Sequence, residues 1–197
     1  MKPFLRPAIA ADDTLKSRYA KHAEELQSLP EGQTERFMQL MTLLGLEAFQ
    51  LGLREDARDY LKNALSITQQ LQNPVVEFHL RLQLAVCLQY LEDLESADEN
   101  FQHALKLTTE EGLQHELGTA LVAWGKLLAE QGKYTVAQSC FQRALTFEEE
   151  QAEPNAVNID TAENALALLE ALGPVDEKGY AVTYTEISHI EVPEIGR

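Results

Sequence analysis

The sequence predicts an all-α solenoid of three helix–turn–helix repeats, with a capping helix before them and a C-terminal helix plus an extended tail after them. Three observations predict this fold. The sequence repeats itself at intervals of 40 residues, each repeat has apolar residues at helical spacing, and the 10 glycines and 7 prolines cluster between apolar segments. With 197 residues, 45% of them hydrophobic and 24% charged, the chain is large enough for one domain with a substantial core.

The repeat is clearest in three segments that align without gaps and begin at Arg54, Leu94 and Tyr134. Each has a small, a large, a small and a large apolar residue at spacing i, i+4, i+7 and i+8, which is one face of an α-helix. We therefore predict a second helix in each repeat, whose alanines allow a neighbouring helix to approach closely. The four columns are Ala57, Ala97 and Ala137; Leu61, Phe101 and Phe141; Ala64, Ala104 and Ala144; and Leu65, Leu105 and Leu145.

A first helix is predicted upstream of each of these segments, because three more columns keep the same interval. Glycine in mid-helix costs up to ~1 kcal/mol relative to alanine, so the recurrence of a small residue at one position indicates that two helices cross closely there. Gly52 and Gly132 mark the turns between the paired helices of copies one and three, whereas copy two has Glu92. The columns are Leu44, Leu84 and Trp124; Gly45, Ala85 and Gly125; and Ala48, Leu88 and Leu128.

The segments that flank the repeats predict further elements. Residues 11–29 form an amphipathic pattern out of register with the repeats, which indicates either a helix that caps the first repeat or a loosely attached arm. Pro154 opens a further helix, because proline suits the first position of a helix. The repeats are expected at residues 33–73, 74–112 and 113–153 and the C-terminal helix at 154–173, so that residues 1–173 make a single domain.

The tail, residues 174–197, has a different pattern. In the stretch GYAVTYTEISHIEV, aromatic and β-branched residues alternate with others at period two, which is typical of a β-strand. A lone strand leaves its backbone hydrogen-bonding groups unpaired, so it must pair or dock. Three arrangements stay open: pairing with a second copy to form a homodimer, docking on the protein's own solenoid, or disorder until a partner binds.

The registered columns resemble the tetratricopeptide repeat family, and the interval of about 40 residues resembles its longer-repeat branch rather than the usual period of about 34. The resemblance covers residues 33–151, with a partial fourth unit beyond them. It implies a right-handed solenoid that binds a protein or peptide without catalysis, as an adaptor or assembly factor. The alternative is a homo-oligomerisation module in which the tail and the terminal repeats form a dimer.

The resemblance also implies a partner-binding surface on the concave face, which the first helices line in this family. The surface is largely apolar and amide, which suits an apolar helix or an extended segment. It lacks the set of lysines, arginine and asparagines with which some members hold a C-terminal carboxylate. The positions carried over are Gln39, Thr42, Leu46, Phe49 and Gln50; His79, Leu82, Val86, Gln89 and Tyr90; and Thr119, Val122, Lys126, Ala129 and Glu130.

Charge and composition limit the partners. The net charge of −16 disfavours nucleic acid and anionic membranes, because both require basic residues, and it favours a basic peptide or protein. The same charge also fits helix faces that are simply solvated. The N-terminal residues lack the apolar core of a signal peptide, and no apolar run is long enough to span a membrane. The two cysteines make no disulfide framework, so we expect a cytoplasmic protein.

No group of residues predicts an enzyme, a cofactor or a metal site. His115-Glu116 begins a zinc-protease motif, but Thr119 stands where the second histidine is required. Cys140 lies in a column with Tyr60 and Asn100, so we interpret it as a partly covered scaffold residue. The run Glu148–Glu150 is expected to be the solvated end of a helix, rather than a cation site.

Overall fold

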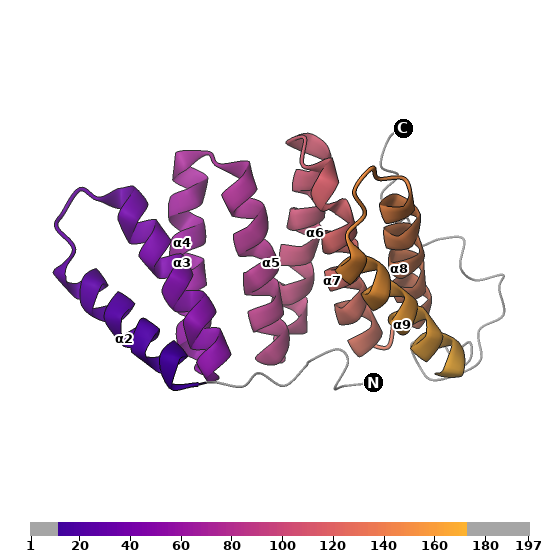
Figure 1. Cartoon of the computed structure of the whole chain (residues 1–197), viewed down its shortest axis with the longest axis horizontal. Coiled ribbons are helices and arrows are strands. Elements are labelled where there is room, and N and C mark those ends of the chain that lie inside the picture. Colours follow the sequence, from indigo (N-terminus) through magenta and orange to yellow (C-terminus); the bar gives the residue numbers. More distant parts are fainter. Residues whose placement is uncertain (1–11, 173–197) are drawn as a thin grey trace. The chain divides into compact units, whose positions relative to one another are not determined.

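The computed structural model describes residues 12–172, which are helical throughout their regular segments and include no strand (Figure 1). The predicted all-α helical repeat fold is confirmed. The predicted strand of the tail lies outside the described residues. The helices are α2 (Asp13–Ser28), α3 (Thr34–Leu51), α4 (Arg54–Leu71), α5 (Pro74–Tyr90), α6 (Leu94–Glu110), the short 3₁₀ helix η1 (Gln114–Glu116), α7 (Leu117–Glu130), α8 (Tyr134–Glu149) and α9 (Ala156–Leu172).

The chain divides within α6 into two compact units, one that ends at Ala104 and one that begins at Leu105. In the first unit α2 packs on α3, α3 on α4, and α4 on α5. In the second unit α7 packs on α8, and α9 packs on both. Each unit is therefore a run of consecutive helices that pack side by side, while the single domain expected over residues 1–173 stays a prediction.

The first helices cross their partners at the small residues that the sequence singled out. A Cβ atom built on Gly45 of α3 would lie 2.7 Å from Cγ of Leu61 in α4, and one on Gly125 of α7 would lie 2.9 Å from the ring of Phe141 in α8. Both distances are shorter than real Cβ contacts. The large side chain of each second helix thus occupies the space that the glycine leaves, and Leu61 and Phe141 are fully buried.

The first helix of each repeat is followed by a residue in the left-handed conformation. After α3, α5 and α7 these are Gly52, Glu92 and Gly132, with φ of 84°, 64° and 80°. In each case the next backbone N–H bonds back to a carbonyl in the last turn, with Leu53 to Ala48 at 2.9 Å as the first example. A second set of positive-φ residues precedes the first helices: Gly32, Gln72 and Gly112, at 85°, 53° and 73°. Only the middle copy lacks glycine at both places.

A buried carboxylate holds α2 against α3. Glu47 is 5% exposed, and its carboxylate lies 2.9 Å from Nδ1 of His22 and 3.3 Å from Nε of Arg18, both in α2. The corresponding residues of the later copies, Cys87 and Leu127, are fully buried. A carboxylate is tolerated at this position of the first copy because donors from α2 satisfy it.

The acidic end of α8 differs from the expectation. Glu148 is buried, at 3% exposure, although the two glutamates that follow it are exposed. Its carboxylate accepts hydrogen bonds from Asn158 Nδ2 at 2.6 Å and from the Asn155 N–H at 2.8 Å. The prediction of a solvated end is therefore wrong for Glu148, because α9 brings donors to it and Gly118 of α7 has no Cβ to collide with it.

The exposed residue that follows α4, Gln72, provides a stability prediction. Gln72 has a left-handed backbone, which costs an L-residue about 1–2 kcal/mol, whereas glycine adopts it freely at an entropic cost of about 0.5–1 kcal/mol. We expect Gln72→Gly to raise the free energy of unfolding by about 1 kcal/mol in urea denaturation. The matched control, Gln70→Gly, lies inside the helix and should lower it by about 0.5–1 kcal/mol. A stabilising effect at both positions, or at neither, would contradict this.

The helix crossing at Gly45 provides a second stability prediction. Alanine would gain up to ~1 kcal/mol in helix propensity but would collide with Leu61, at a cost of about 1–3 kcal/mol. We expect Gly45→Ala to lower the free energy of unfolding in the wild-type background. In a Leu61→Ala background, already destabilised by about 2–5 kcal/mol, the same change should be neutral or stabilising. Equal losses in the two backgrounds would show that the crossing is not the constraint.

Candidate functional site

The predicted partner-binding residues differ in their accessibility. Gln39, Gln50 and His79 are exposed, and Thr42, Leu46, Phe49, Val86, Tyr90, Thr119, Lys126 and Glu130 are partly exposed. Leu82, Gln89, Val122 and Ala129 are buried, with exposures of 7%, 3%, 6% and 4%. Neighbouring helices cover these four, so their side chains have almost no surface to offer a partner. The accessible part of the predicted surface is therefore concentrated on α3 and α5, in the first unit.

Two aromatic residues join the accessible faces of α3 and α5. The rings of Phe49 and Tyr90 meet edge to face, with centroids 5.1 Å apart and planes at 84°. Leu46 precedes Phe49 by one helical turn and Val86 precedes Tyr90 by one turn, and both are partly exposed. We call these four residues the α3–α5 patch. It is an apolar surface with two rings at one end.

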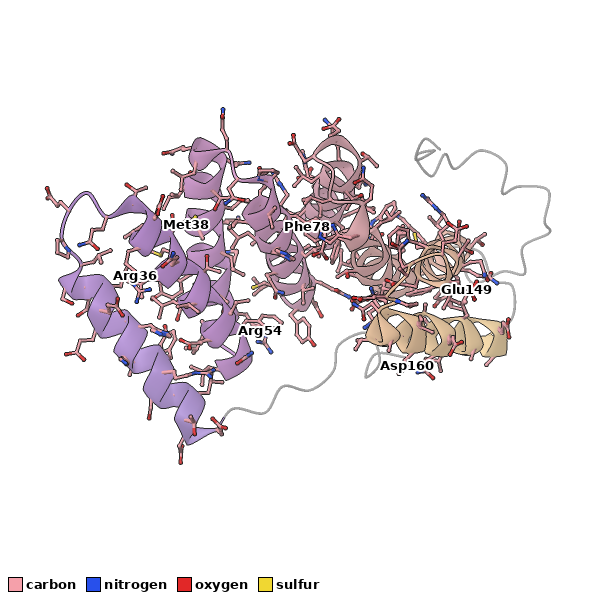
Figure 2. The ribbon with its side chains drawn as sticks, turned by 45° about the horizontal axis from the view of Figure 1, so that its top comes forward. Arg36, Met38, Arg54, Phe78, Glu149 and Asp160 are labelled. Carbon is pink, nitrogen blue, oxygen red and sulfur yellow. The ribbon has the colours of Figure 1, made fainter. Side chains whose placement is uncertain are left out.

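Arg54, the first residue of α4, completes this end of the patch. Its guanidinium carbon lies 4.3 Å from the centroid of the Phe49 ring and 4.8 Å from that of Tyr90. Its Nη1 donates a hydrogen bond to the carbonyl of Phe49. Figure 2 shows Arg54 beside the turn that joins α3 to α4. The guanidinium thus rests on both rings and is tied to the last turn of α3.

Sequence reasoning missed Arg54, although a signal was present. The corresponding residues of the later copies are Leu94 and Tyr134, so this column carries a large side chain in every copy. An arginine in a column that otherwise has apolar residues indicates a cation that lies against apolar neighbours. Its position directly after the turn placed it outside the first-helix columns from which the partner-binding residues were chosen.

In the second unit, the predicted face of α7 is partly used by α9. The Thr119 hydroxyl oxygen accepts a hydrogen bond from Asn158 Nδ2 at 3.2 Å. Burial lowers the pKa of Lys126, the only cation among the predicted positions. Since α9 engages this face, its capacity for an external partner is smaller than that of the α3–α5 patch.

The residues whose side chains could suggest an active site or a metal site are parts of the helical scaffold. Cys140 and Cys87 are both fully buried, so Cys140 is covered more completely than the sequence indicated. Burial raises the pKa of the Cys140 thiol to about 12 and that of Cys87 to about 11. Within residues 12–172, no three histidine, cysteine or acidic side chains are grouped to hold a metal ion. His115 is an exposed residue of the short helix η1.

None of the described helices combines the length and the apolar character needed to cross a membrane.

Comparison with known sequences identifies the repeat. Residues 76–150, which cover nearly all of α5 through α8, match the sequence model of the tetratricopeptide repeat. These residues belong to the tetratricopeptide repeat family. Tetratricopeptide repeats generally mediate protein–protein interaction, and their fold is typically non-catalytic. The pair α3–α4 lies before the matched range but has the same glycine crossing and the same left-handed helix end.

Comparison with solved structures shows a protein with a similar fold. The crystal structure of BtubC (BKLC) from P. vanneervenii is similar, with a TM-score of 0.69 and 16% sequence identity. The match covers 81% of this chain and 66% of that one, so this chain spans slightly less than two thirds of the length of BtubC. At this identity the likeness shows a shared fold. No curated protein sequence matches this chain significantly.

The buried thiols give a prediction for labelling. The thiolate is the reactive form, and pKa values of about 11 and 12 keep Cys87 and Cys140 protonated at neutral pH. We expect a maleimide or disulfide reagent at pH 7.5 to label the folded protein at least ~100-fold more slowly than the protein in guanidinium, and raising the pH to 9 to change this little. Labelling of Cys140 at the denatured rate would show that it is accessible and open to a chemical role.

Proposed function

We propose that this protein is a noncatalytic adaptor or assembly factor of the cytoplasm, which binds a segment of a partner protein on the α3–α5 patch. The observation that supports the proposal is the pair of partly exposed rings, Phe49 and Tyr90, which meet at the end of two first helices. Aromatic residues are enriched among those that dominate binding energy in protein interfaces.

The composition of the patch limits the bound segment. Leu46 and Val86 extend the apolar surface by one turn beyond the rings, and the exposed amides Gln39 and Gln50 lie on the same helix as Leu46. Such a surface suits two or three apolar side chains on one face of a helix or along an extended segment, with polar edges. The net charge of −16 favours a partner whose overall charge is positive, because attraction at long range raises the rate of association.

The proposal is tested by capture and by direct binding. The affinity-tagged full chain is used to capture proteins from the native lysate, and a captured protein is then purified and titrated against variants. We expect Phe49→Ser to weaken binding by at least ~30-fold, the loss of about 2 kcal/mol or more that is typical of a dominant aromatic contact. Circular dichroism should show an unchanged fold, because Phe49 is not part of the buried core.

A matched control lies at the opposite end of α5. Leu71 and Val75 are exposed apolar residues, at 43% and 47%, near the turn between α4 and α5. Leu71→Ser and Val75→Ser remove similar apolar surface and should change the affinity less than 2-fold. If these variants weaken binding and Phe49→Ser does not, the partner binds elsewhere.

Self-association through residues 174–197 is the alternative, and it gives a different result. The chain has a mass of 22.1 kDa. Light scattering of the full chain over a range of concentrations would then give twice this mass, and deletion of the tail would restore the monomer. The adaptor proposal expects a monomer mass in both cases.

A further inference from the structure

Arg54 differs from the other arginines of the first unit in its charge partners. Each of the other four described there has a carboxylate within 4 Å, whereas Arg54 forms no ion pair with any described residue. The four pairs are Arg18 with Glu47 at 3.3 Å, Arg36 with Glu25 at 2.7 Å, Arg58 with Asp59 at 2.8 Å, and Arg81 with Glu77 at 2.7 Å. The chain has 32 acidic and 16 basic residues, so carboxylates are in excess, yet no described carboxylate pairs with Arg54.

Among the described residues, the remaining donors of Arg54 have no acceptor. A guanidinium has five N–H groups, and one described acceptor, the Phe49 carbonyl, takes a bond from Nη1. Within the described residues no nitrogen of Arg54 is buried without a partner. The contacts with the rings of Phe49 and Tyr90, together with the bond to the Phe49 carbonyl, restrict the guanidinium before a partner arrives. A restricted guanidinium loses less side-chain entropy on binding than a free one.

We propose that Arg54 binds the carboxylate of an aspartate or glutamate side chain in the partner segment, next to an apolar side chain that lies on the α3–α5 patch. This inference rests on the proposed function and names the chemistry of the partner at that site. A carboxylate matches the forked N–H groups of arginine with two parallel hydrogen bonds. The apolar neighbour follows from the surface on which the guanidinium rests, since Leu46, Phe49, Val86 and Tyr90 are all partly exposed.

The geometry favours a side-chain carboxylate over the C-terminal carboxylate of a chain. Terminal carboxylates are held by several converging donors, such as a nest of backbone N–H groups. At the patch the structure provides one guanidinium, and the next arginine of the same helix, Arg58, is paired with Asp59. The overall charge of −16 acts at long range and favours a basic partner, whereas Arg54 acts at contact distance on one acidic side chain within it.

The test is a selection of peptides by the full chain. A phage library of random dodecapeptides is selected in parallel on the wild type, on Arg54→Gln and on Arg58→Gln. For the wild type and for Arg58→Gln, we expect enriched sequences with aspartate or glutamate at a fixed spacing from a leucine, isoleucine or aromatic residue. For Arg54→Gln, the apolar position should persist and the acidic one should disappear. Arg58→Gln is the matched control, one turn further along α4.

A synthetic peptide of the most enriched sequence then measures the contact by fluorescence anisotropy. Changing its acidic residue to the amide should weaken binding to the wild type by about 10-fold to 100-fold, and binding to Arg54→Gln by less than 2-fold. Arg54→Lys keeps the charge without the fork and should recover only part of the loss. Amidation of the C-terminus should leave the affinity unchanged, and a loss on amidation would overturn the assignment to a side chain.

The outcomes separate this inference from the proposed function. Enriched apolar peptides without an acidic position, or an acidic position that Arg54→Gln retains, overturn the role of Arg54 and leave peptide binding in place. Selection of nothing by the wild type overturns both. The melting temperatures of Arg54→Gln and Arg58→Gln show that each variant is folded.

Discussion

The two helices of a repeat can pack only as closely as the residues at their crossing allow. Gly45 and Gly125 remove the side chain at that point, so that Leu61 and Phe141 fill the space where a Cβ would be. The alanines around these large residues are fully buried, which keeps the rest of the contact close as well. The first helix can then end against its partner in a short turn with a left-handed residue. Because one side of each first helix packs on its partner helix, the accessible residues lie on its other side.

Both flanking helices are attached by a buried carboxylate, and the repeat explains how. In the first two copies the positions that correspond to Glu148 are Thr68 and Thr108, whose hydroxyls bond to carbonyls of their own helices. In the last copy Glu148 instead accepts bonds from α9. Glu47 serves α2 in the same way, through His22 and Arg18. An isolated buried carboxylate would be costly, so these contacts depend on the added helix being present.

The candidate site uses the same turn that ends the first helix. The turn after α3 brings Arg54 back over Phe49, and the neighbouring repeat brings Tyr90 to the same place. Sequence columns identified both rings, because helical periodicity places positions 49 and 90 on the accessible side of the first helices. They did not identify Arg54, because its side chain reaches the patch from a different helix. The same columns also predicted Leu82, Gln89 and Val122 as partner-binding residues, but neighbouring helices bury them.

The sequence by itself determined the helices, their pairing and the crossing points, since these depend on local periodicity and on small residues that recur at one interval. It also determined that Glu92 and Gln72 stand where other copies have glycine. Only the tertiary structure decided which polar residues are buried with partners, and that Arg54 rests on two rings with no described carboxylate beside it. Glu148 and Arg54 have ordinary sequence neighbours, and what distinguishes them is the set of groups that other helices bring within hydrogen-bonding distance. A carboxylate that meets donors is part of the scaffold, whereas a guanidinium that rests on two rings is the group we propose for contact with a partner.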